Sequence, residues 1–169
     1  MSEDIILATA DEKYAEEIRQ YRQEFIDCND HMDGCGSLRK FENPYEYIED
    51  CLRRSLADKA EEKSDRAQQF FCIRKCDNHL IGMIQYRYEA DPKFQIGYSV
   101  RPNDRGQGYA KWMLKQLLEW IKKQGMSEAP IACEPSNIAS EHVILSCGGE
   151  LVETCNYMWI DLQVYSLKL

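Results

Sequence analysis

Hydrophobic positions recur at steps of three and four residues in three parts of the chain, which predicts three amphipathic helices, and a cap followed by a glycine stop predicts a fourth. In chain order these helices cover residues 11–26, 43–56, 109–123 and 137–147. Asn43 followed by Pro44 is typical of a helix start, and Ser136 or Asn137 can cap the fourth helix. Gly125 and the pair at 148–149 are typical of helix ends. The charged run 58–66 is expected to be the exposed end of the second helix and a linker.

Shorter apolar or alternating runs lie between these helices and predict seven β-strands. The expected strands are Ile5–Ala8, Gln69–Arg74, Leu80–Tyr88, Phe94–Arg101, Ile131–Cys133, Leu151–Thr154 and Tyr157–Leu162. Turn residues at 77–78 and 91–92 separate the three central strands closely enough to favour antiparallel pairing. The last two strands are expected to form a closing hairpin around Cys155-Asn156.

The order of elements, β-α-α-β-β-β-α-β-α-β-β, predicts an α/β (α+β) fold in a single domain spanning residues 1–169. The helix after Gly108 is a crossover, so the strands before and after it are expected to run parallel. The expected architecture is therefore a mixed, mostly antiparallel central sheet with helices on both faces.

Charge and composition narrow the class of partner. The chain has 21 Lys and Arg against 29 Asp and Glu, a net charge of −8, which argues against nucleic acid and favours a neutral or cationic small substrate. No apolar run is long enough to span a membrane, and the acidic start is unlike a signal peptide. We therefore expect a cytoplasmic protein without a membrane partner, whose eight cysteines are reduced.

Cys28, His31 and Cys35 are close enough in sequence to raise the question of zinc. A structural zinc site needs four converging ligands, and no second cluster is visible, so no metal is expected. The same loop does not match the calcium-binding template, because Lys40 falls where a carboxylate is needed. A disulfide- or zinc-stabilised binding domain remains a competing interpretation.

The stretch from Tyr98 to Lys111 combines the end of a strand with a glycine-punctuated helix start. At a helix N-terminus the first backbone N–H groups have no intrahelical partner, and the macrodipole adds partial positive charge. Gly106 and Gly108 remove side chains that would keep a phosphate away, and Arg105 adds a cation. The stretch therefore predicts a pyrophosphate site that needs neither a lysine nor a metal.

A more specific pattern lies within this stretch. Arg105-Gly-Gln-Gly-Tyr-Ala110 resembles the R/Q-x-x-G-x-G/A motif of the GCN5-related N-acetyltransferases, the GNAT superfamily. The strand Ile96–Val100 precedes it as the family's fourth strand does. Asn137-Ile-Ala-Ser140, followed by Gly148-Gly149, resembles the family's second motif. The order of predicted elements is also that of the family, so the resemblance covers nearly the whole chain.

The resemblance implies an acetyl-CoA site between the strand that ends at Val100 and the strand 131–133. Backbone groups of Tyr98, Ser99 and Val100 would bind the pantetheine arm, with Asn137 on the other side and Ser140 nearby. The pyrophosphate would bind backbone N–H groups of Arg105, Gly106, Gln107, Gly108, Tyr109, Ala110 and Lys111. The implied reaction is direct transfer of an acetyl group to a primary amine of a small molecule or peptide, with the Val100 N–H stabilising the oxyanion.

The catalytic acid and base do not carry over from the family. The position of the family's frequent general-acid tyrosine is Ile144, and the position of its occasional catalytic glutamate falls near Phe94. Glu134, which ends the strand beside the expected cleft, is the tentative base. Tyr98 and Tyr157 are weaker candidates for protonating the thiolate. Because these roles are open, a non-catalytic CoA-binding sensor or interaction domain is the alternative function.

The connection between the first two helices usually lines the acceptor pocket in this family. It contains Asp27, Asp30 and Asp33, which would favour a cationic amine, and the segment 34–38 would form a pocket wall. We expect Asp30 and Asp33 to belong to the substrate pocket. An exposed edge at the closing hairpin would suit a homodimer, although no residue decides the oligomeric state.

Overall fold

The computed structural model describes residues 4–57, 65–88 and 90–169, so residues 58–64 of the expected charged linker lie outside the described residues. The described residues form strands β1 (Ile5–Ala8), β2 (Ala67–Arg74), β3 (His79–Arg87), β4 (Ile96–Val100), β5 (Glu128–Cys133), β6 (Glu150–Tyr157) and β7 (Ile160–Lys168). The α-helices are α1 (Ala15–Asp27), α2 (Pro44–Leu56), α3 (Tyr109–Lys123) and α4 (Ile138–Ser146). Short 3-10 turns occupy Glu12–Tyr14, Leu38–Lys40, Pro92–Phe94 and Pro102–Asp104.

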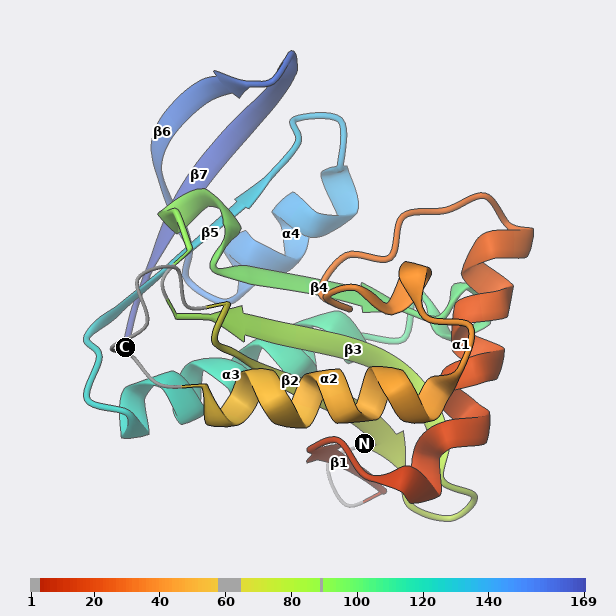
Figure 1. Ribbon diagram of the computed structural model, residues 1–169. Coiled ribbons are helices and arrows are strands. Elements are labelled where there is room, and N and C mark those ends of the chain that lie inside the picture. Colours follow the sequence, from red (N-terminus) through yellow and green to blue (C-terminus); the bar gives the residue numbers. More distant parts are fainter. Residues whose placement is uncertain (1–3, 58–64, 89) are drawn as a thin grey trace.

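Two antiparallel sheets carry the fold. Strands β1, β2, β3 and β4 form one sheet in chain order, and β5, β7 and β6 form the other, with β7 in the middle. Figure 1 shows α2 across one face of the first sheet and α3 behind the other, while α4 lies near the second sheet. The mixed α and β fold, its order of elements and its helices on both faces are confirmed.

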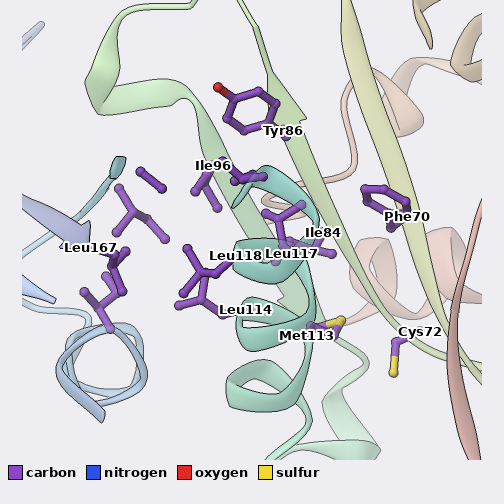
Figure 2. Packing of buried hydrophobic residues seen from close by; sticks show 14 of the residues in the cluster. Phe70, Cys72, Ile84, Tyr86, Ile96, Met113, Leu114, Leu117, Leu118 and Leu167 are labelled. Atoms are coloured by element: carbon purple, nitrogen blue, oxygen red, sulfur yellow. The ribbon is translucent and has the colours of Figure 1, made fainter. Parts of the chain in front are cut away.

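Each face of the first sheet has its own apolar core. The inner stripe of α3 packs against β3, β4, β5 and β7, and Figure 2 shows Met113, Leu114, Leu117 and Leu118 projecting from that helix into this cluster. On the other face, α1 and α2 cover Phe71, Ile73, Leu80 and Met83. Burial of these side chains is the dominant favourable term for the fold, and it fixes the strand ends that carry the site.

Local sequence signals place the helix ends correctly. The Asn43 side chain accepts a hydrogen bond from the Tyr45 N–H (3.0 Å), and Pro44 occupies the first turn of α2. Of the two candidate caps of α4, Asn137 is the one used, since its Oδ1 accepts from the Ser140 N–H at 3.1 Å. Gly108 (φ 84°) immediately precedes α3, as expected.

Two strand relationships differ from expectation. No ladder joins β4 to β5 within the described residues: β5 forms its antiparallel ladder with β7, and the two sheets diverge between β4 and β5. The expected single mixed sheet with a parallel pair is therefore replaced by two antiparallel sheets. The strand expected from Phe94 begins at Ile96, because Asp91 caps a 3-10 turn over residues 92–94.

The closing hairpin turns three residues later than the sequence suggested. Tyr157 pairs with Ile160, so the turn is Met158-Trp159 and not Cys155-Asn156. Asn156 lies within the strand opposite Asp161, and its Nδ2 donates to the Asp161 Oδ1 at 2.8 Å. Asparagine is common in turns, so an asparagine that bonds to the neighbouring strand can be mistaken for a turn residue in the sequence.

In the parts of the chain that the structure describes, no helix is long and apolar enough to cross a membrane.

Candidate functional site

The free edge of β4 faces the second sheet. Arg101 N–H donates to the Ile81 carbonyl and Arg87 N–H to the Gln95 carbonyl, which fixes the residues of β4 that bond to β3. Directly opposed pairs in an antiparallel ladder alternate between bonded and non-bonded. Ser99, opposite Met83, therefore directs its main chain toward β3, whereas Tyr98 and Val100 direct theirs away from it. The divergence of the sheets leaves three positions of β4, Ile96, Tyr98 and Val100, facing the gap between the sheets.

A glycine turn leads from β4 into α3. Gly106 (φ 76°) and Gly108 (φ 84°) both have left-handed backbone geometry, which favours glycine. A Cβ built on Gly106 would meet no atom within 4 Å. The segment Arg105–Gly108 is exposed, and Tyr109, Ala110 and Lys111 form the first turn of α3 behind it, with Gln107 between the glycines. The space beside Gly106 is therefore open, just before the first N–H groups of α3, which have no partner within the helix.

Arg105 is fixed at this helix start by two hydrogen bonds. Its Nε donates to the Val100 carbonyl at 3.0 Å, and its Nη2 lies 2.6 Å from the Asp30 Oδ2. The hydrogen bond from Arg105 is the main reason that the pKa of Asp30 lies below its ordinary value. Asp30, expected in the acceptor pocket, is thus the partner of the expected phosphate-binding arginine.

A second layer of ionic contacts holds the turn before α3. His79 Nε2 lies 2.9 Å from the Asp104 Oδ2, and its Nδ1 lies 3.1 Å from the Glu17 Oε2. Arg101, only 4% exposed, bonds to the Glu17 carbonyl and lies 3.4 Å from that carboxylate. This cluster ties the turn to β3 and α1. No local sequence pattern indicates this cluster, because its members are far apart in the chain.

Two hydroxyl groups meet on the α4 side of the gap. The Tyr98 hydroxyl lies 2.8 Å from the Ser140 Oγ, within the first turn of α4. Burial raises the pKa of the Tyr98 phenol above its ordinary value, and the hydrogen bond with Ser140 opposes this only in part. The phenol therefore stays protonated at neutral pH. Asn137 lies beside this pair and uses its carboxamide oxygen for the helix cap.

Asp33 lies on the opposite side, in the connection between α1 and α2. Its side chain retains solvent contact, yet the surrounding protein raises its pKa by desolvation, and the negative charge of Glu134 raises it further. Glu134 is exposed and immediately follows β5. The structure therefore brings the two predicted carboxylates, Asp33 and Glu134, within electrostatic reach of each other, and Asp33 also influences Tyr98.

The segment that carries Asp33 lies directly on β4, as Figure 1 shows for the α1–α2 connection. A Cβ on Gly34 (φ 68°) would lie 2.1 Å from the Gly97 carbonyl oxygen, so only glycine allows this approach. Ser99 secures the crossing, since its Oγ donates to the Asp33 carbonyl at 2.6 Å and lies 3.0 Å from the Tyr21 hydroxyl. The Ser99 side chain thus anchors the segment, a role that the sequence did not suggest.

The remaining candidates lie elsewhere. Ile144, at the position of the family tyrosine, is fully buried beneath Gly149. Tyr157 packs its ring against Phe94 with ring centroids 4.9 Å apart, near the base of the hairpin turn.

The cysteines of the structure are all free thiols. Cys35 is buried, its Sγ lies 3.2 Å from the Ser99 Oγ, and desolvation raises its pKa to about 12. Cys28 is exposed. Among the described residues, no three His, Cys, Asp or Glu side chains are grouped as metal ligands.

Comparison with known proteins identifies the family. The family model described as "Acetyltransferase (GNAT) domain" matches residues 6–150. The uncharacterized N-acetyltransferase YnaD of Bacillus subtilis (strain 168) is 31% identical over 88 residues, which cover 51% of this chain and 52% of that protein. The match thus spans about half the length of this curated relative.

Solved structures share the fold over nearly the whole chain. The ribosomal-protein-S5-alanine acetyltransferase of Vibrio fischeri is 17% identical with a TM-score of 0.77, and the alignment covers 98% of this chain and 93% of that one. RimL, a ribosomal L7/L12 alpha-N-protein acetyltransferase solved with coenzyme A, is 16% identical with a TM-score of 0.76 and coverage of 98% and 94%. The family model, which matches well over half of the chain, shows that this protein belongs to the GNAT family of N-acetyltransferases.

Proposed function

We propose that this protein transfers an acetyl group from acetyl-CoA to the primary amine of a peptide or protein. The observation that carries the proposal is the combination of a free β4 edge with an open glycine turn at the start of α3. An amide-rich pantetheine arm suits a strand edge, and a pyrophosphate suits a helix N-terminus. The GNAT family membership and the CoA-bound fold relative support the same ligand.

The residues of the chain fit that ligand. Backbone groups of Tyr98 and the Val100 N–H would face the pantetheine arm, while Ser99 is bonded into the ladder and the Val100 carbonyl accepts from Arg105; the Asn137 Nδ2 would donate from the other side. Arg105 and the N–H groups of residues 106–111 would hold the pyrophosphate. The open space beside Gly106 suits a phosphate group, and any side chain at this position would occupy that space.

Bound acetyl-CoA supplies an activated thioester. In our proposal the amine nitrogen attacks its carbonyl carbon, the Val100 N–H stabilises the developing oxyanion, and the carbon–sulfur bond then breaks. The Tyr98–Ser140 hydroxyl pair protonates the departing thiolate, which replaces the missing family tyrosine. Glu134, directly or through water, takes one proton from the bound ammonium group before the nitrogen attacks and a second from the nitrogen afterwards; one of these protons restores the hydroxyl pair and the other goes to solvent.

The acceptor side of the proposal rests on Asp33 and Glu134. Two carboxylates close enough to interact would attract an ammonium group to the end of the cleft. The fold relatives are named for acetylating ribosomal proteins, one at an alanine, which points to an N-terminal amine as acceptor. A net charge of −8 also suits a basic protein partner.

The site can be tested by a matched pair of glycine substitutions at the two ends of α3. Gly106 (φ 76°) and Gly125 (φ 86°) share the left-handed geometry, and a Cβ on either meets no protein atom within 4 Å. Gly106→Ala should weaken acetyl-CoA binding at least tenfold in calorimetry, because the methyl group enters the phosphate position. Gly125→Ala carries the same backbone strain and should bind normally.

Equal affinity of the two variants would place the pyrophosphate elsewhere and refute the site. If the wild type binds acetyl-CoA but acetylates no amine, the alternative of a non-catalytic CoA-binding sensor would replace the proposed reaction.

A further inference from the structure

Three polar side chains lie in a row on the face of β2 and β3 that α2 and the α1–α2 connection cover. Gln69 and Gln85 are each 2% exposed, and Arg87 is half-buried beside them. Burying an amide without hydrogen bonds costs about 1–3 kcal/mol, so such residues in a sheet core need a compensating network. The proposed chemistry uses none of the three.

The network has a fixed direction. Arg87 Nε donates to the Gln85 Oε1 at 2.9 Å, and Gln85 Nε2 donates to the Gln69 Oε1 at 3.0 Å. Gln69 Nε2 then donates to the Gly34 carbonyl at 2.9 Å. Because an arginine side chain has only donors, Gln85 must present its oxygen to Arg87. That choice orients each amide in turn, so the chain of bonds ends with a donor aimed at Gly34.

Gly34 is the point where this network reaches the site. It lies against Gly97 of β4, next to Asp33, whose carboxylate we assign to the acceptor amine. Ser99 holds the Asp33 carbonyl from one side, and Gln69 holds the Gly34 carbonyl from the other. Two consecutive carbonyl groups are thus clamped, which restricts where the Asp33 side chain can lie. Arg87 also lies close enough to Asp33 for their charges to attract.

We propose that Arg87, Gln85 and Gln69 are positioning residues, which hold the Asp33–Gly34 segment on β4 and thereby set the place of the acceptor amine. This inference rests on the proposed function, since it assigns the acceptor to Asp33. It concerns the acceptor only. The acetyl-CoA side of the cleft is built from β4, α3 and α4, and it lies outside the network.

The test uses substitutions that remove a hydrogen-bond donor of the network and keep the side-chain volume nearly unchanged. Gln69→Met removes the donor to Gly34. Gln85→Glu still accepts from Arg87 but cannot donate to Gln69. Gln68→Met, the same substitution at the neighbouring residue, is the matched control, since the adjacent strand position points to the other face of the sheet. Arg87→Lys keeps a donor and Arg87→Met removes it, so recovery by lysine separates donation from packing.

Hydrogen exchange of residues 33–36 in the free protein measures the clamp without any turnover. We expect exchange there to be about tenfold faster in Gln69→Met and Gln85→Glu than in the wild type and in Gln68→Met. With a peptide bearing an N-terminal alanine, the same variants should raise KM for the peptide about five- to tenfold. The KM for acetyl-CoA should change less than twofold, and Arg87→Lys should be closer to the wild type than Arg87→Met.

Unchanged exchange in folded variants of an active enzyme would overturn the network as a clamp. Faster exchange with an unchanged peptide KM would overturn its positioning role. Should Gln69→Met fail to fold, Gln85→Glu decides the question by the same readouts. Failure of the proposed function is distinguishable from both results, because the wild type itself would then acetylate no peptide. In that case the positioning role would be refuted as well.

Discussion

Asp30 and Asp33 are three residues apart, yet the structure gives them different partners. Asp30 is paired with Arg105 at the start of α3, on the phosphate side of the proposed cleft. Asp33 lies over β4 near Tyr98 and Glu134, on the proposed acceptor side. Our proposal therefore assigns two carboxylates that look equivalent in the sequence to different substrates.

This separation predicts that the same substitution, Asp to Asn, affects the KM of a different substrate at each of the two positions. Asp33→Asn should raise KM for a peptide amine about tenfold and leave KM for acetyl-CoA unchanged, because it removes an attraction for the ammonium group. Asp30→Asn should raise KM for acetyl-CoA a few-fold, since the exposed ion pair that orients Arg105 contributes about 1 kcal/mol or less. Steady-state kinetics with both substrates varied measures the two effects.

The pH dependence gives the sign of the Asp33 effect. Its pKa lies above the ordinary 3.8, so the carboxylate loses its charge at a higher pH than an exposed aspartate would. The peptide KM should therefore rise as pH falls through this raised pKa, and Asn at position 33 should abolish that rise. A peptide KM that responds to Asp30→Asn and not to Asp33→Asn would reverse the assignment.

The hydroxyl pair of Tyr98 and Ser140 makes the second residue-scale prediction. Tyr98→Phe should lower kcat about ten- to a hundredfold, because general-acid catalysis contributes on the order of a hundredfold or more and Ser140 can supply part of it. Affinity for acetyl-CoA should stay within about threefold. Tyr45→Phe, at an exposed position of α2, is the control and should leave kcat unchanged. A wild-type kcat in Tyr98→Phe would remove the phenol from the mechanism.

At the scale of elements, the turn of the β6–β7 hairpin has an unusual backbone conformation. Its two-residue turn places Met158 (φ 47°) and Trp159 (φ 71°) in left-handed conformations, which two-residue hairpin turns require and which Asn-Gly adopts most easily. Left-handed geometry costs a non-glycine residue roughly 1–2 kcal/mol. Both side chains are exposed, Trp159 by 96%, so they recover little of that cost by burial.

Replacing Met158-Trp159 with Asn-Gly should therefore stabilise the protein by about 2 kcal/mol. For a chain of this size that corresponds to a Tm increase of about 4–8 °C, measurable by calorimetry. The same Asn-Gly pair at Thr154-Cys155, within the ladder, is the matched control and should lower Tm. An unchanged or lower Tm for the turn variant would show that the two residues are not strained.

The helices illustrate what can be predicted from local sequence. Asn43 with Pro44, Asn137 and the glycine before Tyr109 define helix starts through contacts within a few residues, and each was predicted at the correct place. The hairpin turn was not, because Met158-Trp159 lacks the residues that normally mark a turn. The sequence therefore predicts the end of an element only where a recognised capping or turn residue occupies that end.

At the scale of the whole molecule, the family and its ligand class could be inferred from two motifs and the order of elements. The divergence of β4 from β5 could not, because it depends on how the two sheets pack against each other and not on any local pattern. The partnership of Arg105 with Asp30 joins residues 75 positions apart, and no local pattern encodes it. The buried Gln69 did leave a signal, since it is flanked at i±2 by the apolar core residues Ala67 and Phe71, whereas Gln85 has apolar Met83 on one side and Arg87 on the other.

The central claim is that the cleft beside β4 transfers an acetyl group to an amine. The most direct measurement is mass spectrometry of a peptide with an N-terminal alanine or serine after incubation with acetyl-CoA and the protein. We expect one acetyl group on the peptide amine for each CoA released. Tyr98→Phe and Gly106→Ala should form much less product. If acetyl-CoA binds the protein but remains intact with every peptide and small amine supplied, the cleft beside β4 does not transfer acetyl groups.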